Sequence, residues 1–152
     1  MTRTLVEINF GSHLYGTSTP ASDVDLKSVF VPSREDILLQ RVGGTVSDHR
    51  PKQPFKKNVS GEVDREAYAL HRYLQMLAEG QLAALDMLFA PRWAMTGDPS
   101  PVWLQIVHSR HYLLSKRVTS FVGYCRTQAN KYGIKGSRVH AVMNVVARST
   151  YN

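Results

Sequence analysis

Two aspartates one residue apart, Asp23 and Asp25, are the side chains of this chain best suited to chemistry. They stand at the start of residues 24–31, an apolar-alternating segment ended by Pro32 that predicts a β-strand. Because side chains alternate between the faces of a strand, both carboxylates are expected on one face, with Val24 turned into the sheet. Carboxylate oxygens are ligands that hard divalent cations prefer. The pair therefore predicts a site for Mg²⁺ or Mn²⁺.

A glycine–serine turn, Gly11 and Ser12, stands ahead of this pair and directly after residues 5–10, whose alternating apolar pattern predicts a first strand. Residues 13–15 fit a first helical turn. Backbone N–H groups exposed at such a turn bind phosphate, and the Ser12 hydroxyl would add a bond to the β- or γ-phosphate. His13 could donate to a phosphate oxygen or serve only as a cap or packing residue. The turn therefore predicts a phosphate site.

Lys27 lies two residues beyond Asp25 and therefore on the same predicted strand face. It could contact a nucleotide or form a salt bridge with the carboxylates. A phosphate-binding turn beside paired metal ligands has the parts that nucleotide transfer from a triphosphate requires, because Mg²⁺ arrives on one or two carboxylates plus the phosphates. Catalysis of this kind would rest on positioning and charge neutralisation. The alternative is a surface turn with two solvated aspartates.

A family resemblance is carried by two motifs, GSxxYG (Gly11, Ser12, Tyr15, Gly16) and SDxD (Ser22, Asp23, Asp25). Together they resemble the signature of the DNA polymerase beta-like nucleotidyltransferase superfamily. The later segment KYGIKG, residues 131–136, is most similar to a branch of predicted nucleotidyltransferases of bacteria and phages. The resemblance covers nearly the whole chain, although only the first motifs are specific. It implies an α+β nucleotidyltransferase fold, a small mixed β-sheet with a helical C-terminal portion, that uses an NTP as substrate.

A third carboxylate is normally needed when two Mg²⁺ ions act together, one at the attacking hydroxyl and one at the triphosphate. In the resembled family this acid stands on a strand that follows the Asp-x-Asp strand and precedes a long helix. The segment GEVDREAY, residues 61–68, occupies that place. The resemblance therefore implies that Asp64 joins the aspartate pair as a catalytic and metal-binding residue. Glu62 and Glu66 share its predicted face, and Glu62 is the main alternative.

Charge is divided unevenly along the 152 residues, whose formal net charge is +7. All twelve acids lie between Glu7 and Asp98, and the eight Lys and Arg that follow have no acid among them. Such a basic field can hold polyphosphate or a nucleic-acid backbone, although a solvated helical surface would give the same pattern. Aromatics alternate with cations there, as in surfaces that stack bases. The predicted ligand contacts in this part are Lys131, Lys135 and Arg138.

Length and composition predict one domain over residues 1–152, with a sheet-based catalytic part at 1–98 and a basic helical part at 99–152. No apolar run approaches the roughly 18 residues needed to cross a bilayer, and the N-terminus lacks the apolar core of a signal peptide. A cytoplasmic protein without membrane association is therefore expected. The lone cysteine, Cys125, cannot form an internal disulfide, and a packed thiol in a helix is predicted.

Local signals predict the remaining elements. A short helix should begin at Ser33, with Asp36 completing a capping-box pattern. Residues 41–58 predict a loop or a hairpin excursion, and a strand at 59–68 should pass into a helix that Gly80 ends. Further helices are expected at residues 82–89, 102–114, 116–132 and 137–148.

Three functions remain open at this point. The first is a Mg²⁺-dependent nucleotidyltransferase that transfers NMP from an NTP to an acceptor hydroxyl. The basic C-terminal part favours an RNA or tRNA 3′ end as acceptor, and the resemblance also permits a protein hydroxyl, as in toxin–antitoxin pairs. The second is a catalytically silent module that binds nucleotide or RNA. The third is a phage interaction protein that acts through its basic surface.

Overall fold

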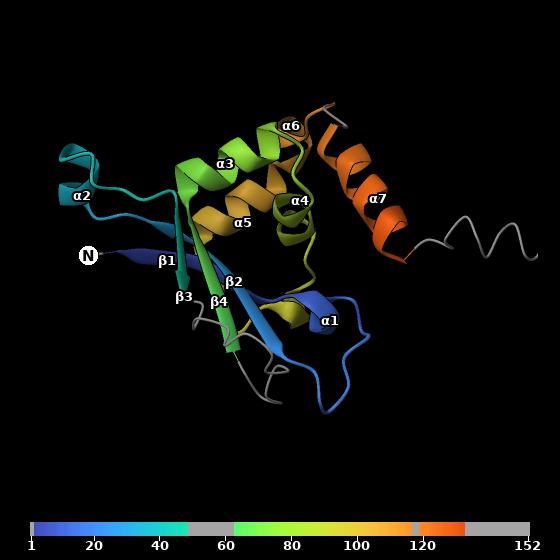
Figure 1. The fold of residues 1–152 in the computed structure, drawn as a ribbon. Helices are drawn as coiled ribbons and strands as arrows, with labels where there is room; N and C mark the ends of the chain where they lie inside the picture. Colours follow the sequence, from blue (N-terminus) through green and yellow to red (C-terminus); the bar gives the residue numbers. More distant parts are fainter. Residues whose placement is uncertain (1, 49–62, 117–118, 133–152) are drawn as a thin grey trace, which may run out of the picture. The chain divides into compact units, whose positions relative to one another are not determined.

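A four-stranded mixed β-sheet organises the computed structural model, which describes residues 2–48, 63–116 and 119–132 (Figure 1). The chain divides into two units, residues 1–117 and 118–152, and each is described by itself. The sheet lies in the first unit, together with every described helix except the last. The combination of a small mixed sheet with helices confirms the predicted α+β class. A single domain over residues 1–152 stays a prediction.

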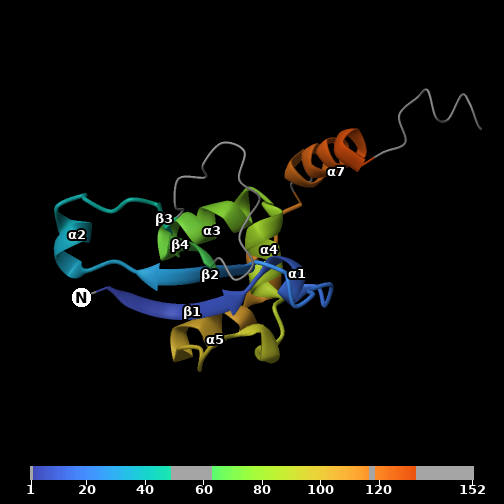
Figure 2. The ribbon, with the colours of Figure 1, turned by 60° about the horizontal axis from the view of Figure 1, so that its bottom comes forward.

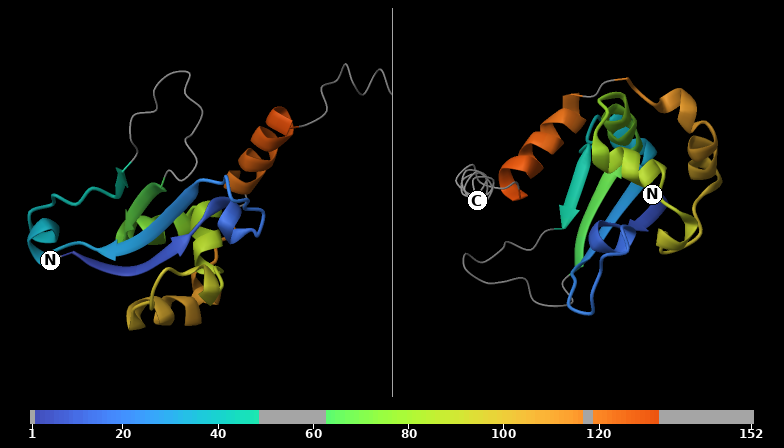
Figure 3. Two further views of the ribbon diagram at one scale, coloured as in Figure 1. Left: turned by 90° about the horizontal axis from the view of Figure 1, so that it is seen from below. Right: turned by 90° about the vertical axis from the view of Figure 1, so that its right-hand side faces the viewer.

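The strands are β1 (Arg3–Asn9), β2 (Val24–Val31), β3 (Thr45–Asp48) and β4 (Val63–Ala69), and they lie in the order β1-β2-β4-β3 (Figure 3). β1 pairs antiparallel with β2, β2 pairs parallel with β4, and β3 pairs antiparallel with β4. The predicted second strand is confirmed with its bounds unchanged. β3 bears out the hairpin alternative for the part of residues 41–58 that the structure describes.

The outer edge of β1 is covered by the segment that follows α4. Ile8 forms an isolated antiparallel bridge with Met95, and Ser100 donates its backbone N–H to the Leu5 carbonyl at 2.8 Å. A register shift between Thr4 and Val6 inserts one residue into β1, so that the neighbouring side chains of Leu5 and Val6 are both buried. Strand β3, at the other edge, is exposed along its whole length.

The described helices are α1 (Gly11–Leu14), α2 (Arg34–Leu38), α3 (Leu70–Ala78), α4 (Leu82–Leu88), the 3-10 helix η1 (Arg92–Ala94), α5 (Pro101–His108), α6 (Arg110–Leu113) and α7 (Thr119–Tyr132). The predicted capping residue of α2 is confirmed, because the Ser33 hydroxyl accepts the Asp36 N–H at 3.1 Å. The predicted stop at Gly80 is also confirmed. Its φ of +69° lets Gln81 donate to the Met76 carbonyl at 2.9 Å, which closes the end of α3.

Two expectations about the later helices are wrong. Residues 102–114 form two helices rather than one, because the chain leaves helical geometry at Ser109, where ψ is 11°. Tyr112 then donates its N–H to the Ser109 carbonyl at 3.0 Å, which starts α6. Cys125 lies on a helix as predicted, α7, but it is exposed rather than packed. The predicted helix at residues 137–148 lies outside the described residues.

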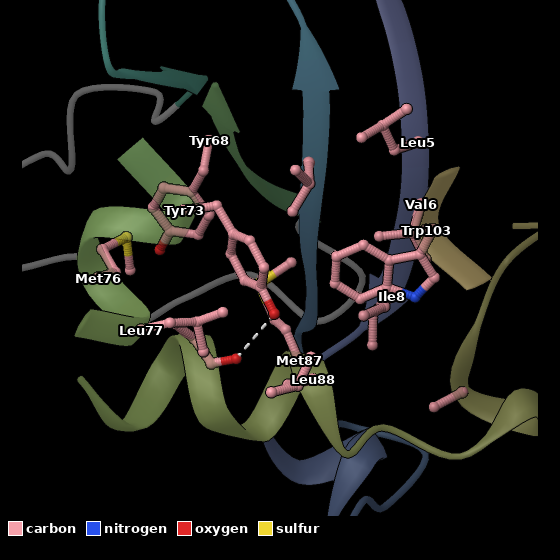
Figure 4. Close-up of a cluster of buried hydrophobic side chains, with 13 residues drawn as sticks. Leu5, Val6, Ile8, Tyr68, Tyr73, Met76, Leu77, Met87, Leu88 and Trp103 are labelled. Carbon is pink, nitrogen blue, oxygen red and sulfur yellow. Dashed lines mark hydrogen bonds between the residues drawn. The ribbon is translucent and has the colours of Figure 1, made fainter. Parts of the chain in front are cut away.

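One hydrophobic core joins the sheet to α3, α4 and α5 (Figure 4). Tyr73 of α3 and Trp103 of α5 are fully buried, and their rings meet with centroids 5.3 Å apart. The Tyr73 hydroxyl donates to the Ala84 carbonyl of α4 at 3.1 Å, so a single residue ties three helices together. Val29 of β2 and Tyr68 of β4 enter the same core. Because the core holds β2 and β4 at these two residues, the starts of both strands, where the predicted site residues lie, are held in fixed positions.

Candidate functional site

Strands β2 and β4 begin at the same end of the sheet, beside α1 (Figures 1 and 2). Their parallel pairing makes Asp25 and Asp64 direct register partners. Neighbouring strands lie about 4.8 Å apart, and register partners share a face, so the two carboxylates stand side by side. Both residues are half-buried. Two of the three predicted carboxylates therefore lie together in the fold, although Asp25 and Asp64 are 39 positions apart in sequence.

The glycine–serine turn is seated directly against this pair. Gly11 has a φ of +59°, and a Cβ added to it would lie 2.3 Å from the Oδ2 atom of Asp25. Phe10 donates its backbone N–H to the Asp25 carbonyl at 2.7 Å, which fixes the turn to the start of β2. Only glycine combines this backbone conformation with so close an approach. The predicted neighbourhood of the turn and the Asp-x-Asp carboxylate is therefore present in the fold.

Tyr15 of the GSxxYG motif, the C-cap residue of α1, fixes the end of the turn to α4. Its hydroxyl donates to Oδ2 of Asp86 on α4 at 2.6 Å, across 71 residues of sequence. Thr17 donates its backbone N–H to the Ser12 carbonyl at 2.9 Å, and Gly16 follows α1 with a φ of +68°. Sequence reasoning missed Asp86, because a single acid in a helical segment carries no signal of a distant partner. The bond between Tyr15 and Asp86 ties the end of α1 to α4.

Ser12 and His13 lie in α1 and are half-buried. The Nε2 atom of His13 is buried and has no hydrogen-bond partner among the described residues. A buried polar atom is usually satisfied, so an unpartnered ring nitrogen fits a group whose partner is an external ligand. The predicted phosphate contacts at Gly11, Ser12 and His13 are compatible with this placement and stay predictions.

Asp23 stands one residue before β2, so no strand pairing fixes its side chain. It is half-buried and already engaged in an interaction within the chain. In residues 2–48, 63–116 and 119–132, no group of three or more His, Cys, Asp or Glu side chains is arranged to hold a metal ion. The fold thus places Asp25 and Asp64 together, while the joining of Asp23 to them stays a prediction.

Lys27 and Glu66 form the register pair two residues further along the two strands, on the same face as Asp25 and Asp64. Their side chains make a salt bridge, the Lys27 Nζ lies 3.2 Å from the Tyr68 hydroxyl, and that hydroxyl donates to Glu66 Oε2 at 2.7 Å. Burial, reinforced by the Glu66 carboxylate, raises the pKa of Tyr68. The Lys27 ammonium also lies 5.0 Å from the centre of the Phe10 ring. Lys27 therefore forms a salt bridge, but with Glu66 rather than with the Asp-x-Asp carboxylates named in the prediction, and its contact with a nucleotide stays a prediction.

Lys27→Met should lower the free energy of unfolding by about 1–3 kcal/mol, because Glu66 would keep a half-buried carboxylate without its cation. Urea denaturation followed by circular dichroism measures the change. The matched control is Arg92→Met, whose partner Asp98 is almost fully exposed and whose loss should cost at most about 1 kcal/mol. Equal losses in the two variants would contradict a structural role for the Lys27–Glu66 pair.

A mixed sheet that seats a glycine–serine turn on a strand carboxylate, with a second acid on the parallel neighbour, defines a polymerase beta-like nucleotidyltransferase fold. The family model described as RlaP, the RNA repair pathway DNA polymerase beta family, matches residues 2–146, and the chain belongs to that family. The motif-based resemblance is therefore confirmed.

A protein of Enterobacteria phage T4, described as an uncharacterized 38.9 kDa protein in the nrdC-mobD intergenic region, is 42% identical over 148 residues. The match covers 95% of this chain and 43% of the phage protein, so the chain spans less than half the length of that relative. No solved structure matches the chain.

The remaining predicted contacts cannot be placed at the site. Lys131 belongs to α7, in the second unit, where the structure does not describe its side chain. Lys135, Arg138 and the alternative acid Glu62 lie outside the described residues, so all four stay predictions. Among the helices that the structure describes, none is both long and apolar enough to cross a membrane.

Proposed function

We propose that this chain is a Mg²⁺-dependent nucleotidyltransferase that transfers NMP from an NTP to the 3′ hydroxyl of an RNA. The observation that carries the proposal is the contact between Gly11 and the Asp25 carboxylate, whose register partner on β4 is Asp64. At Gly11 the turn has no side chain between its backbone and two carboxylates that would be suited to hold a cation. Membership of an RNA repair pathway family supports RNA as the acceptor class.

Asp25 and Asp64 would hold the cation, with Asp23 as the third carboxylate. Mg²⁺ needs only one or two protein carboxylates when substrate phosphates and water complete its octahedron, so the adjacent pair fits this ion without a complete protein cage. Mn²⁺ prefers the same oxygen ligands. When bound, the cation would supply charge neutralisation at the triphosphate and polarisation of the attacking hydroxyl.

The chain's own groups would position the substrate. The Ser12 hydroxyl and the backbone N–H groups of the turn would bind the β- and γ-phosphates, with His13 donating from its unpartnered ring nitrogen. In the transfer, the acceptor oxygen forms a bond to the α-phosphorus, the bond to the β-phosphate oxygen breaks, and pyrophosphate leaves. The acceptor hydroxyl would release its proton to water as it attacks. Positioning of these groups would account for most of the rate enhancement.

A second candidate is a module that binds nucleotide or RNA without turnover. The absence of a preformed three-ligand metal group among the described residues favours it. A protein acceptor is a further alternative to RNA. One experiment distinguishes the silent module and the protein acceptor from the main proposal.

The test is incubation of the chain with α-³²P-labelled NTP and Mg²⁺ or Mn²⁺, with total RNA or cell protein as acceptor. The proposal expects label in RNA from the α-labelled NTP and none from γ-labelled NTP, because pyrophosphate is released. Label in protein alone would replace RNA by a protein acceptor. NTP binding without transfer to either acceptor would establish the silent module and overturn the enzymatic proposal.

A further inference from the structure

An exposed aromatic side chain and an arginine are stacked on the face of the first unit that carries α4 and α6. Phe89, the C-cap residue of α4, is 50% exposed, and the guanidinium carbon of Arg110 on α6 lies 4.9 Å from its ring centre. A cation held on an aromatic face is attracted by the ring, so the pair is pre-organised without being buried. Arg110 is exposed and Phe89 half exposed, so both groups are accessible to a ligand.

No described side chain neutralises the charge of Arg110 through a salt bridge. No acid follows Asp98 in the sequence. Two residues further along α6, Tyr112 is 82% exposed. Guanidinium groups bind phosphates through paired donors, and exposed aromatic rings stack unpaired bases. Exposed rings next to an unopposed cation thus favour a single-stranded nucleic acid over an apolar protein partner.

Two contacts and a short step along α4 lead from the candidate active site to this pair. Gly11 touches Asp25, Tyr15 at the end of α1 bonds Asp86, and Asp86 lies three residues before Phe89. Residues three apart on a helix are neighbours on one face. In Figure 1, α4 lies between α1 and α6. A single-stranded RNA whose 3′ end lies at Asp25 would therefore pass the exposed Tyr15 before it reaches Phe89.

We infer that Phe89 and Arg110 form a binding surface for the single-stranded acceptor RNA, with a base stacked on Phe89 and a phosphate bound by Arg110. The inference rests on the proposed function and deepens it, because it assigns the acceptor a path on the first unit. It differs from the contacts predicted at Lys131, Lys135 and Arg138, which belong to the second unit.

The test measures binding of a 5′-fluorescein single-stranded RNA of about twelve nucleotides by anisotropy over a series of salt concentrations. Phe89→Leu should weaken binding by about fivefold or more, because it removes a stacking ring but keeps an apolar side chain. Arg110→Gln should weaken binding and lower the salt slope by about one, because one phosphate contact is lost. The matched control, Arg34→Gln, removes an equal charge from α2, an exposed helix, and should reproduce neither the fivefold loss nor the full reduction in slope.

Two further measurements make the outcome decisive. The same RNA annealed to its complement should show little dependence on Phe89, since paired bases are not free to stack on it. Binding of a fluorescent NTP with Mn²⁺ should be unchanged in both variants, which shows that the turn is intact. Unchanged RNA affinity and salt slope in Phe89→Leu and Arg110→Gln, or equal losses in Arg34→Gln, would overturn the surface. RNA binding that depends on both residues, in a chain that transfers no nucleotide, supports the surface and counts against the proposed function alone.

Discussion

Asp25→Asn and Asp64→Asn should each lower nucleotide transfer by about 10²–10³-fold, while the folded protein becomes no less stable. The loss follows because an amide does not replace a charged ligand of the cation, whose contribution to the transition state is several kcal/mol. The gain or neutrality in stability follows because the two carboxylates are direct register partners, and like charges opposite each other on neighbouring strands are destabilising by about 0.2–1 kcal/mol.

Transfer of α-labelled nucleotide measures the first effect, and urea denaturation in metal-free buffer measures the second. The matched control is Asp98→Asn, which removes an exposed carboxylate at the end of the acidic part of the chain. It should change neither quantity appreciably. Transfer that persists in Asp25→Asn would remove this residue from the metal site, and persistence in both variants would remove the proposed mechanism.

Gly11→Ala should abolish most transfer and destabilise the fold, because the new Cβ would lie 2.3 Å from Oδ2 of Asp25. The methyl group must displace either the carboxylate or the turn, and the left-handed backbone adds a cost of about 1–2 kcal/mol for a residue with a Cβ. We expect a total loss of at least about 2 kcal/mol in the free energy of unfolding, with transfer falling further than stability explains.

Gly16→Ala is the matched control for this prediction. Gly16 has a similar φ of +68°, but a Cβ added there meets no atom within 4 Å. The variant should therefore show the backbone cost alone and should retain transfer. If Gly16→Ala lost transfer as severely as Gly11→Ala, the contact with Asp25 would not be the cause. Equal stability and activity of Gly11→Ala and the unaltered chain would contradict the seating of the turn on β2.

Local signals in the sequence predicted the elements that depend on near neighbours. The strand at residues 24–31, the Ser33 cap and the stop at Gly80 each follow from a few adjacent residues, and the structure has all three. The candidate site was predicted in part for the same reason. The turn and the Asp-x-Asp pair lie in one continuous motif, and Asp64 came from its resemblance-based place before a helix.

Contacts between distant residues were beyond such signals. The bond between Tyr15 and Asp86 and the stacking of Arg110 on Phe89 depend on how helices pack after the chain has folded. The break between α5 and α6 was also missed. The helical pattern of the sequence continues across Ser109, so no local signal marks the end of α5 there. The sequence offered two alternatives for Lys27, and only pairing of β2 with β4 places Glu66 beside it.

The parallel pairing of β2 and β4 connects the candidate site, at the start of both strands, to the hydrophobic core further along them. Side chains alternate along a strand, so sliding β4 by a single residue would send the Asp64 carboxylate to the opposite side of the sheet from Asp25. Val29 and Tyr68, further along the same ladder, resist such sliding because both are held in the core. Packing changes at these two positions would consequently misalign the carboxylates without altering any residue near them.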